Sequence, residues 1–168
     1  MKMREALLPE FNQEMATTRK VLERCPDDKF DWKPHAKSWS IDRLATHVAD
    51  LPGWAALAFG GDSFDIAPPG AEPMKFEPAK SQKELLEKFD KNVADTRAAL
   101  SKAEDEELMQ EWSLLGGGQV IFKMPRVAMW RNMIMNHHIH HRAQLSVYLR
   151  LNDIPVPAMY GPSADEPN

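Results

Sequence analysis

Residues 136–150 have the sequence NHHIHHRAQLSVYLR, in which four histidines fall within five positions. The large apolar residues around them recur every three or four positions, a spacing that predicts one face of a helix. That stripe consists of Trp130, Ile134, His137, His141, Leu145 and Tyr148. Among the clustered histidines, His137 and His141 alone are four residues apart. They are therefore expected one above the other on the inward-facing side of this helix.

This placement predicts a site for a divalent metal. A buried imidazole needs a hydrogen bond or a metal, because an unsatisfied buried polar group costs about 1–3 kcal/mol. Two imidazoles on consecutive turns can share one cation, as in zinc sites with an i,i+4 histidine pair. His47 lies in another apolar helical stripe, with Leu44, Val48 and Leu51. Three convergent histidines leave coordination positions open, which is typical of catalytic metal sites.

Each histidine also has a simpler interpretation. A single core histidine, as His47 would be alone, is usually just a hydrogen-bonded polar group. His138 and His140 fall on the flanking faces of the helix and are expected at the surface or behind the ligands. His35 lies in a proline-containing loop and is expected to face solvent. Asp50, one turn after His47, is either a carboxylate that orients the His47 ring or a solvated acid.

The rest of the chain predicts an all-α four-helix bundle that forms a single domain over residues 1–168. Apolar periodicity predicts helices over 4–24, 41–59 and from 81 to the acidic residues 104–107, and Pro125 precedes a fourth over 126–151. Ser40 and Ser81 are the candidate N-caps. Pro52-Gly53 is expected to kink or divide the second helix. We expect a long loop over 62–78 and either a short hairpin or an irregular crossover over 111–122, with a tight turn at Gly116-Gly117-Gly118. An extended tail over 154–168 is expected along the bundle, with its last residues loose.

Composition excludes several classes of function. The net charge is −4 and no Lys/Arg run is present, which argues against a nucleic-acid partner. The single cysteine, Cys25, excludes an internal disulfide, agrees with a reducing compartment and is interpreted as an apolar filler rather than a reactive thiol. No apolar run has the length of a secretory signal core or of a membrane span. We therefore expect a cytoplasmic protein without a membrane partner.

Residues 124–152 resemble the last helix of the DinB-like family of damage-inducible, metal-binding proteins, which is related to bacterial thiol-dependent transferases. The resemblance extends to the loop and second helix and to the tail, through Trp32-Lys33-Pro34-His35, Lys37-Ser38-Trp39-Ser40, Leu44-Ala45-Thr46-His47, Ile154-Pro155-Val156-Pro157 and Tyr160-Gly161-Pro162-Ser163. It implies a four-helix bundle, often a homodimer, with one divalent metal on three histidines. By position these are His47, His137 and His141. The metal is zinc, nickel or manganese in relatives, some of which use a low-molecular-weight thiol such as bacillithiol or mycothiol.

These observations favour a metal-dependent thiol transferase or hydrolase that acts on a small-molecule substrate. A metal-bound thiol or water has a lowered pKa and becomes a nucleophile near neutral pH. The sequence assigns no general base, for which Asp50 and His138 are the candidates. The alternative is a non-catalytic metal-binding stress-response protein in which the ion ties two helices together. A third interpretation takes the histidines as packed polar groups without a metal.

Overall fold

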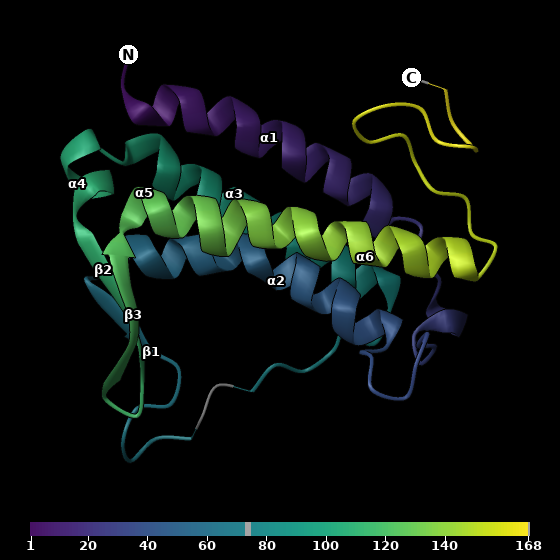
Figure 1. The fold of residues 1–168 in the computed structure, drawn as a ribbon, viewed down its shortest axis with the longest axis horizontal. Coiled ribbons are helices and arrows are strands. Elements are labelled where there is room, and N and C mark those ends of the chain that lie inside the picture. Colours follow the sequence, from purple (N-terminus) through teal and green to yellow (C-terminus); the bar gives the residue numbers. More distant parts are fainter. Residues whose placement is uncertain (73–74, 168) are drawn as a thin grey trace.

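The computed structural model describes residues 1–72 and 75–167, and within these it is mostly helical with a small three-stranded sheet at one end (Figure 1). The long helices are α1 (Met3–Leu22), α2 (Ile41–Phe59) and α3 (Gln82–Lys102). A further helical run consists of α5 (Arg126–Met129), the π-helical segment η2 (Trp130–Asn136) and α6 (His137–Leu151). The short elements are the 3-10 turn η1 (Asp27–Lys29), the helix α4 (Asp105–Met109) and the strands β1 (Ser63–Asp65), β2 (Glu111–Gly116) and β3 (Gln119–Pro125).

The helices pack around a shared hydrophobic core. Helix α2 packs against α3 and α6, and α1 packs against α3 and α6 from the other side. Each helix contributes large, fully buried side chains, among them Phe11, Leu44, Leu85 and Trp130. The apolar stripes found in the sequence thus meet in one cluster, and burial of apolar surface is the main force that holds the helices together.

The prediction of an all-α four-helix bundle was incomplete, because the structure also contains a small sheet. The predicted hairpin is confirmed, since β2 and β3 pair antiparallel and turn at Gly117 and Gly118, whose φ angles are 62° and 79°. The loop predicted over 62–78 contains β1, which pairs parallel with β2, Ser63 opposite Ser113. The Asp65 carboxylate accepts hydrogen bonds from the Gly117 and Gly118 amides at 3.1 and 2.7 Å and joins this loop to the hairpin tip. Positions 73 and 74 of the predicted loop lie outside the described residues.

The second helix is not divided at Pro52-Gly53, because α2 runs through both residues. Proline in a helix interior leaves backbone carbonyls without their usual donors. Here the missing donor is the one from which the Val48 carbonyl would accept. Two side chains of α3 add hydrogen bonds to other carbonyls beside the proline. The Thr96 hydroxyl donates to the Pro52 carbonyl at 2.5 Å, and the Asn92 amide donates to the Ala49 carbonyl at 2.9 Å. The neighbouring helix therefore supports α2 around Pro52, and His47 lies on an unbroken helix.

Two further segments, one after α3 and one at the C-terminal end, differ from expectation. Residues 104–107, expected only to close the third helix, begin the short helix α4. The tail is extended as predicted, but hydrogen bonds and ion pairs hold it as far as Glu166, whose carboxylate meets Arg24 at 2.5 Å. Asn168 lies outside the described residues. None of the described helices combines the length and apolar character needed to span a membrane.

Candidate metal centre

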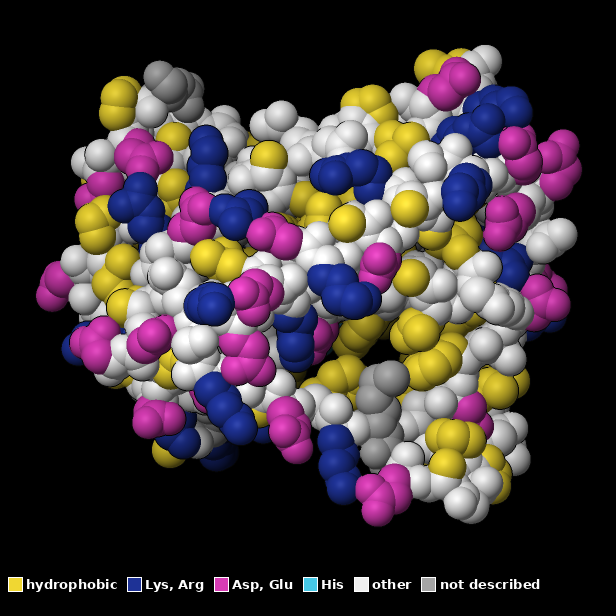
Figure 2. Space-filling view, turned by 180° about the vertical axis from the view of Figure 1, so that it is seen from behind, with side chains coloured by type: hydrophobic (Ala, Val, Ile, Leu, Met, Phe, Trp, Pro, Cys, Tyr) yellow, Lys and Arg dark blue, Asp and Glu magenta, His cyan; other side chains and the backbone are white. Residues whose placement is uncertain are grey.

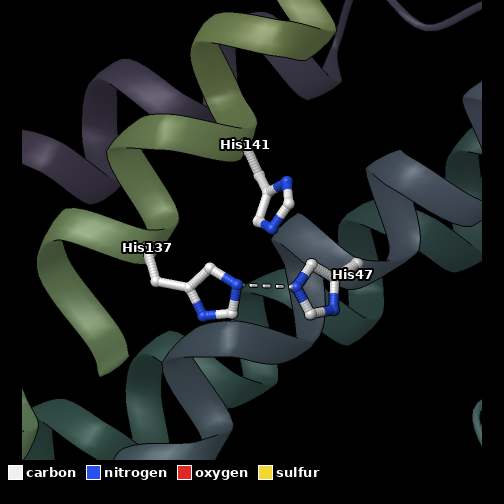
Figure 3. A group of neighbouring side chains, drawn as sticks. All are labelled: His47, His137 and His141. Carbon is white, nitrogen blue, oxygen red and sulfur yellow. Dashed lines mark hydrogen bonds between the residues drawn. The ribbon is translucent and has the colours of Figure 1, made fainter. Parts of the chain in front are cut away.

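Three histidine side chains from two helices face one another (Figure 3). His47 comes from the middle of α2, and His137 and His141 come from consecutive turns of α6, which packs against α2. The Nε2 atoms of His47 and His137 are 3.3 Å apart. One ring nitrogen from each of the three lies within 4.8 Å of the other two. The structure therefore brings together the three histidines that the sequence predicted as metal ligands.

The hydrogen bonds of the α6 pair fit a metal site. The Nδ1 atom of His137 lies 3.3 Å from the Met133 carbonyl, and that of His141 lies 2.7 Å from Oε1 of Gln144. Because both partners are oxygen acceptors, the Nδ1 atoms carry the protons and the Nε2 lone pairs are free. Two ligands of a tetrahedral zinc ion, each about 2.0–2.1 Å from it, lie about 3.3 Å from each other. The spacing of the His47 and His137 nitrogens matches this value.

The electrostatics keep all three rings neutral at pH 7, which is the form that binds metal. Burial, reinforced by charge on His141 and His137, lowers the pKa of His47 to about 4. Burial also lowers the pKa of His137 and that of His141. Protons therefore do not compete for these nitrogens near neutral pH.

The position of the pair on α6 differs from the prediction in one respect. His137 and His141 are half-buried at the edge of the core, beside α2, rather than at its centre. The fully buried stripe of α6 runs through His138, Arg142, Leu145 and Leu149. The prediction that this pair lies on one face beside His47 agrees with the structure, but the fully buried face is one residue away from the predicted one.

His138 is the clearest error in the sequence interpretation. It was expected at the surface or behind the ligands, but it is fully buried and faces α1, where its Nε2 lies 2.7 Å from the Thr18 hydroxyl. Burial lowers its pKa to about 3. It is therefore a core residue rather than a general base beside the ligands. His140 and His35 are exposed, as predicted.

Asp50 does not orient the His47 ring. Its carboxylate is half-buried and pairs with the Lys88 ammonium at 3.4 Å. Burial raises the pKa of Asp50, and Lys88 opposes that shift. Asp50 instead lines a cavity of about 240 Å³ that it shares with His47, Arg43 and Trp39.

Two tryptophans that the sequence analysis did not assign to the site enclose the histidines. Trp39 stacks on His141, with ring centroids 5.9 Å apart, and meets His47 edge-on at 5.2 Å. Trp54 lies 5.4 Å from His47 and 5.9 Å from His137. Trp54 is two helical turns after His47, so its position on the same face was available in the sequence. Trp39 lies before α2 begins, and no periodicity indicates where it points.

A larger cavity, of about 450 Å³, borders the histidines on the His137 side. It lies between the helices and the sheet end of the molecule, where Figure 2 shows a hollow with a hydrophobic rim. The two cavities share Trp54 and Phe76, and each reaches one of the histidines. The candidate centre is therefore open to small molecules from two sides.

Comparison with known proteins agrees with this geometry. The family model described as the DinB family matches residues 1–168. An uncharacterized protein of Bacillus subtilis, YrdA, is 24% identical over 162 residues, which cover 95% of this chain and 89% of that protein. A DinB-like protein of Bacillus cereus has a similar fold, with a TM-score of 0.75 and 22% identity over 95% of this chain and 98% of that one. The DinB-like protein YjoA of Bacillus subtilis superposes with a TM-score of 0.66 and 21% identity over 89% and 96% of the two chains.

Proposed function

The chain belongs to the DinB family, and from this premise we propose that it binds one divalent metal ion through His47, His137 and His141. The observation that carries the proposal is the convergence of these imidazoles, with the Nδ1 atoms of the α6 pair already hydrogen-bonded to oxygen acceptors. Three neutral imidazoles suit zinc, nickel or manganese, among which geometry and availability select.

We further propose that the site is catalytic, in a thiol transferase or a hydrolase with a low-molecular-weight thiol or water as the nucleophile. A bound divalent ion would lower the pKa of that thiol or water. The protein's own contribution is positional. Gln144 and the Met133 carbonyl fix the rings of His141 and His137, and the faces of Trp39 and Trp54 shield the histidines from bulk water.

The second candidate function is a structural metal that ties α2 to α6. It is favoured by one observation, that the three histidines come from two helices that pack against each other. The two cavities beside the histidines favour the catalytic alternative, because a structural site is normally closed.

Metal titration tests the binding proposal. Metal-free protein is titrated with zinc, nickel, cobalt and manganese in a calorimeter, and the bound metal is quantified by elemental analysis. We expect one ion per chain for the wild type and for His140→Ala, a control that removes an exposed histidine from the same helix. His47→Ala and His141→Ala are each expected to lose at least about tenfold in affinity, since a ligand is removed. A wild-type protein that takes up none of the four metals overturns the proposal.

Activity assays separate the two roles of the metal. Metal-loaded protein is assayed for thiol transfer to 1-chloro-2,4-dinitrobenzene and for hydrolysis of p-nitrophenyl acetate. In thiol transfer the sulfur–carbon bond forms, chloride leaves and the thiol proton passes to solvent. A catalytic site predicts a metal-dependent rate that His141→Ala abolishes and His140→Ala retains. If metal raises the melting temperature of the wild type but neither reaction is accelerated, the structural role is favoured.

The resemblance to DinB-like proteins also supports a four-helix bundle of DinB-like type as a single domain, assembled as a homodimer. Light scattering after gel filtration measures the mass directly. A mass near twice 19.1 kDa is expected.

A further inference from the structure

The larger cavity beside His137 has walls of one chemical type. Among the described residues that line it, His137 alone has a side chain that can ionise, and the others are apolar or aromatic. The walls come from α2 (Leu57), from the sheet (Phe64, Trp112), from the loop after β1 (Ile66) and from the helical run before α6 (Met133). Its volume, about 450 Å³, is within the range of small-molecule binding sites and far above the voids of a close-packed core.

The cavity reaches the candidate metal centre directly. His137 contributes both to its wall and to the group of three histidines, and its Nε2 lies 3.3 Å from that of His47. Trp54 borders the cavity and contacts both of these rings. A molecule that fills the cavity therefore has one end beside His137, the ring that faces His47 in Figure 3.

The smaller cavity on the other side of Trp54 differs in chemistry. Besides aromatic residues, it is lined by His47 and by the charged residues Arg43 and Asp50. A charged or strongly polar ligand group finds partners there, whereas in the larger cavity it would lose its hydration without compensation. The larger cavity thus suits an apolar part of the reacting molecules, and the smaller cavity suits a polar or charged part.

We propose that the larger cavity is the substrate-binding pocket and that it takes a neutral small molecule with an aromatic or branched hydrocarbon body, whose single reactive group lies at the His137 end. This inference rests on the proposed metal-dependent function and adds the substrate class to it. Sugars, nucleotides and other highly polar molecules are excluded from this side, because the side chains that line it offer few hydrogen-bonding groups, namely the His137 imidazole and the indole N–H groups of Trp54 and Trp112.

A fluorescent probe tests the binding. N-phenyl-1-naphthylamine, a neutral aromatic molecule whose emission rises in apolar surroundings, is titrated into metal-free and zinc-loaded protein. Saturable binding at one site per chain is expected in both forms. Leu57→Trp fills the cavity and Leu114→Glu places a charge on its wall, so each is expected to weaken binding by about tenfold or more. Val147→Trp is the control, because it adds a tryptophan at a position 56% exposed on α6, and it is expected to bind as the wild type does.

Circular dichroism and melting curves confirm that each variant is folded before the affinities are compared. Because Leu57 and Leu114 occupy different elements, a defect in one variant leaves the other as an independent test. Absence of saturable probe binding to the wild type, or equal binding by both cavity variants and the wild type, overturns the inference.

The cobalt-loaded form tests the proximity to the centre. Cobalt(II) absorbs visible light and is paramagnetic, so a probe beside it is expected to fluoresce less than in the zinc-loaded form. In His141→Ala treated with cobalt, the probe is expected to bind but to keep its emission. Probe binding without any metal binding refutes the proposed function and leaves the cavity as a ligand site. Metal binding without probe binding refutes the inference alone.

Discussion

Arg142 on α6 reaches Glu14 on α1 inside the core, with guanidinium nitrogen and carboxylate oxygen 2.7 Å apart and the two side chains 1% and 10% exposed. The guanidinium also donates to the Glu14 carbonyl, to the Thr18 hydroxyl and to Tyr160, which in turn donates to the Glu14 carboxylate at 2.7 Å. This network joins the helix that carries two of the candidate ligands to α1 and to the tail. Arg142 lies on the buried stripe of α6, next to the face that carries the candidate ligands, so the network holds the helix on its α1 side.

Arg142→Met is expected to destabilise the protein by about 3–5 kcal/mol, because it leaves the Glu14 carboxylate buried without a positively charged partner. The free energy of unfolding in urea, measured by circular dichroism, gives the value. Arg131→Met is the matched control, since Arg131 pairs with Glu10 between the same helical run and α1, but at the surface. We expect a loss of at most about 1 kcal/mol there. Equal effects of the two substitutions would contradict the importance assigned to the buried pair.

Gly53→Ala is expected to destabilise the protein although alanine favours helices. A Cβ atom at this position would lie 2.8 Å from Oδ1 of Asn92, whose amide donates to the Ala49 carbonyl. Asn92 must move and lose that hydrogen bond, so we expect a loss of about 1–2 kcal/mol. Gly61→Ala is the control, because the nearest atom to its added carbon is 3.9 Å away.

A double-mutant cycle identifies the cause of this effect. In an Asn92→Ala background the obstacle is gone, and Gly53→Ala is expected to stabilise the helix by up to about 1 kcal/mol. A loss of stability that persists in that background would show that the space beside Asn92 is not the reason for the glycine.

Cys25 is expected to be unreactive in the folded protein. Its side chain is fully buried, and burial raises the pKa of the thiol to about 12, so almost no thiolate is present at pH 8. Native protein mixed with 5,5′-dithiobis(2-nitrobenzoic acid) is expected to release no colour within minutes, and one equivalent in guanidinium chloride. Val147→Cys, at an exposed position, provides the reactive control. Rapid labelling of native wild-type protein would contradict the interpretation of Cys25 as a core residue.

The sequence was sufficient where a feature depends on local periodicity, and insufficient where it depends on neighbouring helices. The four-residue spacing of His137 and His141 identified a pair on one face, and the structure brings His47 to it. Whether that face or the next one points to the centre of the core is decided by how α1 and α2 flank α6, so His138 was misplaced. The π-helical segment η2 adds to the difficulty, because it changes the number of residues per turn just before α6.

The strand β1 was missed for a similar reason. It has only three residues, Ser63 to Asp65, and a run of this length carries no alternating pattern. This segment is a strand because its backbone pairs with β2, whose residues lie about 50 positions later in the chain. The hydrogen bonds that Asn92 and Thr96 of α3 donate to α2 beside Pro52 are likewise not revealed by the local sequence.

The metal-free protein is expected to lose stability as the pH falls from about 6.5 towards 4. The pKa values of His138 and His47 are lowered to about 3 and about 4, below the value near 6.5 of an unfolded chain. The unfolded state therefore binds more protons in this range, so the stability is complete above pH 6.5 and declines below it. For the fully buried His138, the free energy of unfolding is expected to fall by up to about 1.4 kcal/mol for each pH unit in this range. Urea unfolding at several pH values in the presence of a chelator measures the slope.

His138→Gln is the decisive comparison, because glutamine can accept the hydrogen bond from Thr18 but does not titrate. We expect a shallower decline in stability between pH 6.5 and 5 for this variant than for the wild type. His140→Gln, at the exposed position two residues away, is expected to leave the slope unchanged. Carboxylates contribute mainly below pH 5, so they do not obscure the difference. Identical slopes for the wild type and His138→Gln would show that the buried imidazole is not what couples the stability of this core to pH.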